Sequence, residues 1–188
     1  MTQFLPAFVI VMVAVQTAPA KPAARTAPNP QAAAQADFQK RTLAYIELRE
    51  SLAKKLEPLS PTASASDLQA RQQALAAALR TARASAQQGD LIPTPVQEQI
   101  RETVQSDLRR REPAAKRATL EEVPQGPLPG INKTYPEQAA LPTIPPLLLA
   151  SLPRLPDNLQ YRFFGRHLVI LDGDTEIVVD YVRDCLPQ

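Results

Sequence analysis

The 188-residue chain carries 21 Lys and Arg against 19 Asp and Glu, a formal net charge of +2, which argues against a dedicated nucleic-acid-binding protein. Its 20 prolines and only five glycines predict irregular segments that are stiff and extended. The single cysteine, Cys185, excludes an intramolecular disulfide and cysteine-rich zinc sites, and leaves either a buried thiol or an intermolecular disulfide.

Residues 1–20 have the pattern of a signal peptide. Residues 4–15 form an unbroken apolar run of 12, which is too short to cross a hydrocarbon core of about 30 Å but typical of a signal peptide. Ala18 and Ala20 then supply the small side chains of a cleavage site. We expect cleavage after Ala20 and a periplasmic or secreted protein. The alternative is an uncleaved helix that tethers the protein to a membrane.

Residues 21–36 are rich in Ala and Pro without an apolar period, which predicts a disordered spacer. Residues 37–112 follow as a helical part. Its first predicted helix covers residues 37–57, and Arg49 interrupts its apolar stripe. That stripe consists of Phe38, Thr42, Tyr45, Leu52 and Leu56.

Two more helices are predicted, over residues 67–88 and 95–112. Ser66 fits the N-cap of the earlier one, with Gln69 completing a capping box, and Gly89 fits its left-handed C-cap. In the later one, Pro95 fits the first helical position. Its apolar face consists of Val96, Ile100, Val104 and Leu108.

Residues 113–157 are the Pro-rich connecting segment, in which ten of 45 residues are Pro. Its leucines favour an extended path wrapped around the domain, and a stiff linker is the alternative. Residues 146–152 are expected to form one or two helical turns with Pro at the start.

Residues 158–186 predict a three-stranded antiparallel β-meander packed on the helices. Gly165-Arg166 fits a two-residue type II′ turn, and Asp172-Gly173 fits a type I′ turn. The predicted pairs are Phe163 with Leu168, Tyr161 with Ile170, Leu168 with Ile177, and Ile170 with Thr175. One face is then apolar, and Tyr181 belongs to it. The other face mixes Phe164, Val169, Leu171 and Val178 with Arg162, His167, Asp174, Glu176 and Asp180. Because an apolar sheet face must be covered, the expected fold class is α+β.

His167 is the only histidine and thus the one weak catalytic candidate. With Asp174 or Asp180 it could serve a small periplasmic hydrolase, although such a base also needs a nucleophile, and the chain has no G-x-S-x-G elbow. A half-exposed strand histidine is the favoured interpretation.

Asp172, Asp174 and Glu176 are weak candidates for a calcium site. Calcium loops of the EF-hand type need about 12 residues, whereas these residues lie in a hairpin turn, so a solvated turn is favoured. The chain has no Gly-rich phosphate loop or dinucleotide fingerprint, and no cofactor is expected.

Residues 134–182, TYPEQAALPTIPPLLLASLPRLPDNLQYRFFGRHLVILDGDTEIVVDYV, resemble a family of exported bacterial proteins of unknown function. In that family a Y-P…L-P-x-x-P-P segment precedes an L-P-x-L-P…L-x-Y-R-F-x-G ending. The likeness extends over the helical part. It implies a signal peptide and an extracytoplasmic location, and it assigns no catalytic residue.

Together these features predict a non-enzymatic binding or structural component of the periplasm or cell envelope. Its partner would be a protein, a peptide or an envelope component, and the membrane would matter only for export. The alternatives are the hydrolase and the tethered protein described above.

Overall fold

The computed structural model describes residues 29–136 and 144–187, so the predicted signal peptide lies outside the described residues. The described chain has the expected α+β class. Its elements are α1 (Pro30–Ala53), α2 (Ala65–Ala82), α3 (Thr94–Arg110), α4 (Pro113–Glu121), α5 (Pro146–Ser151), β1 (Leu159–Phe164), β2 (His167–Asp172) and β3 (Val178–Val182). Within these ranges, every helix is too short or too polar to cross a membrane.

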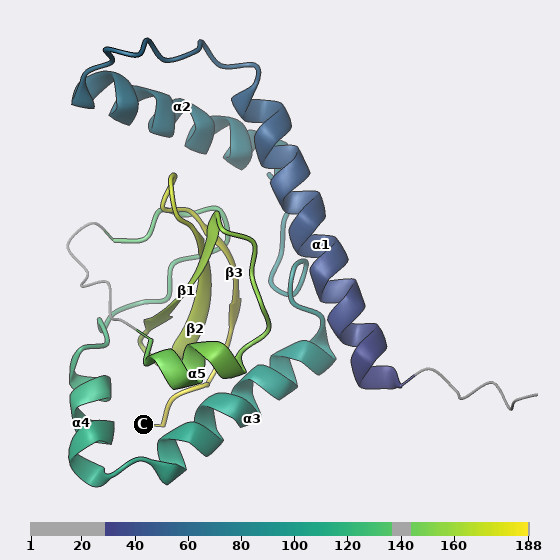
Figure 1. Cartoon of the computed structure of the whole chain (residues 1–188), viewed down its shortest axis with the longest axis vertical. Helices are drawn as coiled ribbons and strands as arrows, with labels where there is room; N and C mark the ends of the chain where they lie inside the picture. Colours follow the sequence, from purple (N-terminus) through teal and green to yellow (C-terminus); the bar gives the residue numbers. More distant parts are fainter. Residues whose placement is uncertain (1–28, 137–143, 188) are drawn as a thin grey trace, which may run out of the picture.

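The three strands form one antiparallel sheet in the order β1-β2-β3. Figure 1 shows α1 along one side of this sheet, α2 across its upper end, and α3 with α5 below it. The main core lies between these helices and one sheet face. It includes Phe38, Leu79, Val96, Ile100, Val104, Leu148, Phe163, Leu168 and Ile170.

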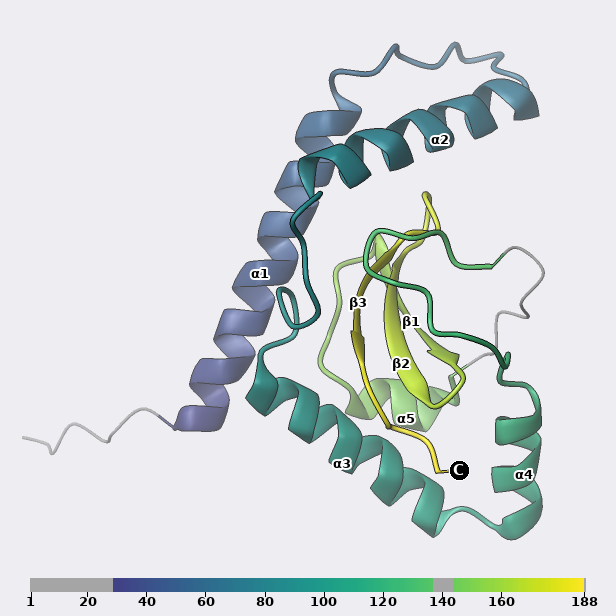
Figure 2. The same ribbon diagram turned by 180° about the vertical axis from the view of Figure 1, so that it is seen from behind.

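The opposite sheet face is covered by the chain that follows α4, which passes behind the strands in Figure 1 and in front of them in Figure 2. Tyr135 packs edge-on against Phe164 at 5.5 Å between ring centroids. Residues 131–135 also border β3, where Asn132 N–H donates to the Val178 carbonyl at 2.8 Å. This second core consists of Tyr135, Phe164, Val169, Leu171, Val178 and Tyr181.

The helices differ from their predicted limits at both ends. Helix α1 begins at Pro30 because the Asn29 side chain accepts a hydrogen bond from Gln31 N–H, so residues 30–36 of the expected spacer are helical. Residues 21–28 of that spacer lie outside the described residues. The alanines at 32–34 favour this extension because Ala has the highest helix propensity.

Helix α2 is capped by Ser64 rather than Ser66, in a capping box with Asp67. It ends at Ala82, so Gly89 is not its C-cap but a loop residue with φ +91°. The expected face of α3 is buried as predicted. Helix α4 lies in the segment that the sequence analysis predicts to be extended. It can form because its single proline stands at the first helical position, where proline is tolerated. Helix α5 also begins with Pro, as predicted.

The first hairpin has the predicted register, with Phe163 opposite Leu168 and Tyr161 opposite Ile170. Gly165 has φ +53°, the positive value that the first position of a type II′ turn requires.

The predicted register of the second hairpin is wrong: Leu168 pairs with Val182, and Ile170 with Asp180. A type I′ turn would need positive φ at Gly173, which is absent from the positive-φ residues of the described chain. Instead the Asp172 carboxylate accepts hydrogen bonds from the backbone N–H groups of Asp174 and Thr175. These hydrogen bonds stabilise a longer loop between the strands.

This shift exchanges side chains between the two sheet faces. Tyr181 lies in the second core instead of the main one, while Asp180 lies opposite Ile170 on the helix-covered side. The apolar residues of the face predicted to be mixed are buried against the chain around Tyr135, and they are Phe164, Val169, Leu171 and Val178.

We expect Phe38→Ala to lower the free energy of unfolding by about 3–5 kcal/mol, because Phe38 is 0% exposed in the main core. Leu43→Ala, on the same helix at 55% exposure, is the matched control and should cost less than about 0.5 kcal/mol. Urea denaturation measures both. Equal losses would contradict the placement of α1.

Candidate functional site

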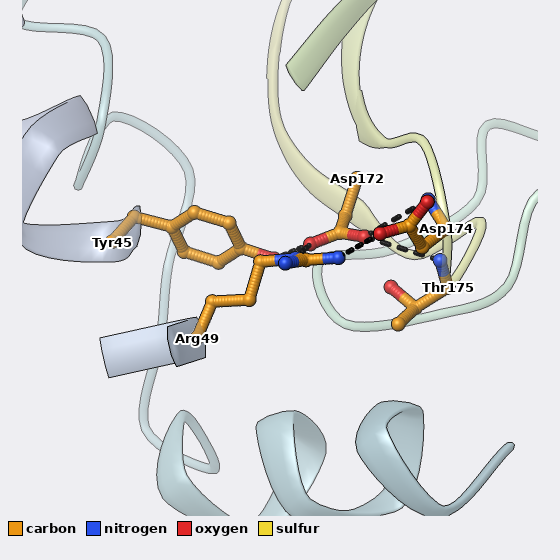
Figure 3. A network of polar contacts seen from close by, with 5 residues as sticks. All are labelled: Tyr45, Arg49, Asp172, Asp174 and Thr175. Carbon is orange, nitrogen blue, oxygen red and sulfur yellow. Dashed lines mark hydrogen bonds and ion pairs between the residues drawn. The ribbon is translucent and has the colours of Figure 1, made fainter. Parts of the chain in front are cut away.

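The side chain of Asp172 is the centre of a buried polar network (Figure 3). Its Oδ2 accepts from the Tyr45 hydroxyl at 2.8 Å and from Arg49 Nε at 2.9 Å. Its Oδ1 accepts the loop amides of Asp174 at 3.2 Å and Thr175 at 3.1 Å. One carboxylate thus joins α1 to the loop between β2 and β3.

Arg49 neutralises this carboxylate from inside the apolar stripe that it interrupts. Its side chain is 9% exposed, and it also pairs with Asp174, whose side chain is 57% exposed. A buried carboxylate is costly without a partner, so the arginine on this helix face compensates Asp172. We interpret the network as a structural clamp.

A second buried carboxylate, Asp180, holds the loop between α2 and α3. It accepts the backbone N–H groups of Gly89 at 3.0 Å and of Leu91 and Ile92 at 2.9 Å each. Burial raises the pKa of Asp180, and these N–H donors oppose part of that rise. Backbone donors carry no signature in the sequence, which is why this role was missed.

Arg83, just after α2, joins the same region to the chain that covers the second core. Its guanidinium lies 5.1 Å from the centroid of the Tyr45 ring. It donates to Asn132 Oδ1 at 3.0 Å and to the Val179 carbonyl at 3.1 Å. Arg49 on α1 and Arg83 after α2 are therefore two buried cations that both bind the sheet.

His167 is not brought together with Asp174 or Asp180. It stands at the start of β2, where its Nδ1 accepts the N–H of Asp184 at 3.3 Å, and burial lowers its pKa. Asp180 lies opposite Ile170, which is three residues from His167 along β2, so Asp180 is about 10 Å or more from His167. Asp174 follows the far end of β2, roughly 17 Å or more from His167.

The three carboxylates proposed for calcium also have three different environments. Asp172 is buried in the clamp, and Asp174 pairs with Arg49. Glu176 is exposed and has a backbone φ of +54°. Across residues 29–136 and 144–187, no group of three or more His, Cys, Asp and Glu is arranged to hold a metal ion.

Cys185 is 0% exposed, with its thiol 3.6 Å from the Val182 carbonyl. Burial raises its pKa to about 12. A buried, protonated thiol agrees with the expectation that Cys185 packs as a small apolar residue. An intermolecular disulfide would require the C-terminal segment to open.

A groove of ≈ 510 Å³ runs beside the outer edge of β1. Its apolar wall includes Leu149, which is 48% exposed, and Leu155. Tyr161 and Arg162 form the strand side, and Arg154 also lines it. Neither Cys185 nor the two buried carboxylates contribute to this groove.

No protein-family model, curated protein or solved structure matches the chain. The resemblance of residues 134–182 to exported bacterial proteins therefore stays a prediction.

We expect Arg49→Met to lower the free energy of unfolding by about 3–5 kcal/mol, because it leaves the Asp172 carboxylate buried without its cation. Asp174→Asn, which removes only the exposed partner, should cost less than about 1 kcal/mol. Urea denaturation measures both. A small effect of Arg49→Met would show that the clamp does not stabilise the fold.

Alkaline pH should destabilise the protein, because burial raises the pKa of Tyr161 far above its ordinary value of 10.0, and that of Cys185 from 9.0 to about 12. The folded state keeps protons that the unfolded chain releases. This contribution is therefore complete below pH 9 and is lost as pH rises toward 12 and beyond.

Tyr161→Phe should reduce the fall in unfolding free energy above pH 10 by up to about 1.4 kcal/mol per pH unit. Thermal melts between pH 7 and 12 give this slope, and Cys185→Ala provides the corresponding test for the thiol. Identical slopes for wild type and Tyr161→Phe would refute the assignment.

Proposed function

We propose that this protein is an exported, non-enzymatic binding or structural component of the bacterial periplasm or cell envelope. The observation that carries the proposal is the structural use of the buried charged side chains. Asp172 and Arg49 fasten α1 to the sheet, and Asp180 fastens the loop at residues 89–92. Groups used in this way are occupied by backbone and side-chain partners rather than presented to a substrate.

The separation of His167 from both aspartates weighs against the hydrolase alternative. A general base acts on a proton within about 3 Å and needs an orienting group at similar range. In the described chain the partner at His167 Nδ1 is the main chain of Asp184. The groove beside β1 supplies a surface on which a binding protein could hold its partner.

The location is tested by expressing the tagged full-length chain in the producing bacterium. We expect it in the periplasm or the medium with Lys21 as its first residue, because the apolar run and Ala18-Pro19-Ala20 direct export and cleavage. Fractionation and mass spectrometry give this result. An intact Met1 in the membrane fraction would support the tether, and a cytosolic chain would refute the proposal.

The binding role is tested by cross-linking the same chain to its envelope neighbours. His167→Ala should give the same cross-linked products in the same yield, because His167 lies outside the proposed binding surface. Turnover of a substrate that this substitution abolishes would instead favour the hydrolase.

A further inference from the structure

A pocket of ≈ 420 Å³ lies where the end of α4, the turn between β1 and β2, and the C-terminal segment meet. This volume is within the range of about 300–1,000 Å³ that is typical of small-molecule sites. Figures 1 and 2 both show the C-terminal end of the described chain between α3 and α4. The pocket shares no lining residue with the groove beside β1, so it is a separate site.

The three walls of this pocket are fastened to one another by main-chain hydrogen bonds at the turn. Gly165 N–H donates to the Pro124 carbonyl at 2.8 Å, which fixes the chain that follows α4. The N–H groups of Cys185 and Leu186 donate to the Arg166 carbonyl at 2.8 Å and 3.0 Å, which fixes the C-terminal segment. Because these walls are already ordered, a ligand would bind without a large loss of chain entropy.

Most of the lining is apolar. Val123 and Leu186 are 4% and 3% exposed and belong to the main core, so they form the buried part of the pocket. Leu120 is half-buried and Pro187 is exposed, so these two side chains are open to a ligand. An apolar tail that covered them would be removed from water, which favours binding.

Arg166 is the only charged residue of the lining, and its guanidinium is weakly occupied. Nη2 lies 3.4 Å from the Asp184 carboxylate, and Nε lies 3.5 Å from the Leu186 carbonyl, whereas a good N–H···O bond measures about 2.7–3.2 Å. Within the described ranges, Nη1 has no hydrogen-bond partner.

The Arg166 guanidinium is also accessible. The side chains of Arg166 and Asp184 are 41% and 56% exposed, and an ion pair in water contributes little. A carboxylate or phosphate that enters the pocket can therefore compete for Arg166, and it can accept two parallel N–H bonds from the guanidinium.

We propose that this pocket binds an amphipathic anion, with a carboxylate or phosphate head on Arg166 and an apolar tail against Leu120 and Pro187. A fatty acid and a single-chain phosphate ester share this chemistry. The inference goes beyond the proposed function, because it adds a small-molecule site to a protein proposed to bind a partner or to serve as a structural component.

The test is calorimetric titration of the purified full chain with four ligands of equal tail length, below the concentrations at which they form micelles. We expect octanoate or octyl phosphate to bind about tenfold more tightly than octanol, because only an anion can pair with Arg166, and octylamine not to bind. The anion that binds more tightly identifies the head group. Equal binding of octanol, or binding of neither anion, would overturn the proposal.

The length of the tail tests the apolar walls. Butanoate should bind more than about tenfold more weakly than octanoate, because it removes four fewer methylene groups from water. Equal affinities would show that the head alone is bound, which would contradict the assignment of the walls.

Substitutions at the ion pair test the role of Arg166. Arg166→Gln should weaken octanoate binding about tenfold. Asp184→Asn should tighten it about twofold or more, because it removes the competing carboxylate, and Asn tolerates the φ of +54° at this position. Arg183→Gln, an exposed cation outside the lining, is the matched control and should change binding less than about twofold.

Unchanged melting temperatures show that these variants fold. Equal losses in the two arginine variants, or no gain with Asp184→Asn, would overturn the assignment of Arg166.

Amide NMR spectra of the wild-type chain locate the site without a substitution. Octanoate should shift the signals of Gln125, Gly165 and Leu186, which line the pocket, and leave those of Gly89 and Gly173 unchanged. Shifts confined to the groove beside β1 would overturn the proposal.

This result is independent of the test of location. A cytosolic chain that binds octanoate at Arg166 would refute export and keep the pocket, whereas an exported chain that binds neither anion would do the reverse.

Discussion

The whole structure depends on one constraint: the Asp172 carboxylate is taken out of water, so it must be neutralised and hydrogen-bonded from several sides. Tyr45 and Arg49 do this from a helix more than 120 residues away in sequence, and two loop amides complete the shell. The clamp fixes where α1 lies on the sheet and fixes the shape of the second hairpin. The α2–α3 loop is held by the same physics at Asp180.

The sequence predicted those elements whose cause is local. Gly165 gives a turn by its own backbone freedom, and the four-residue repeat from Val96 to Leu108 gives the buried face of α3. The second hairpin failed because Asp172-Gly173 satisfies the local rule for a tight turn, while the Asp172 side chain binds the loop amides instead. Tyr45 and Arg49 hold the Asp172 carboxylate in this arrangement from α1, far away in the sequence.

The candidate site was less predictable than the fold. Arg49 was visible as a charge inside an apolar stripe, but nothing nearby in the sequence identifies Asp172 as its partner, 123 residues away. Asp180 was assigned to the wrong face by the failed register, and its partners are backbone amides that any sequence could supply.

The order of the elements along the chain has a consequence for how the molecule reaches its final state. The helices come first, but the main core to which they contribute is completed by strands synthesised last, between residues 159 and 182. Long sequence separation between contacting residues slows folding, because the connecting chain must be ordered before the contact is gained. During synthesis, the apolar faces of α1 and α3 therefore emerge before the sheet that completes their packing. A chaperone that shields them until the C-terminus arrives would prevent aggregation of the nascent chain.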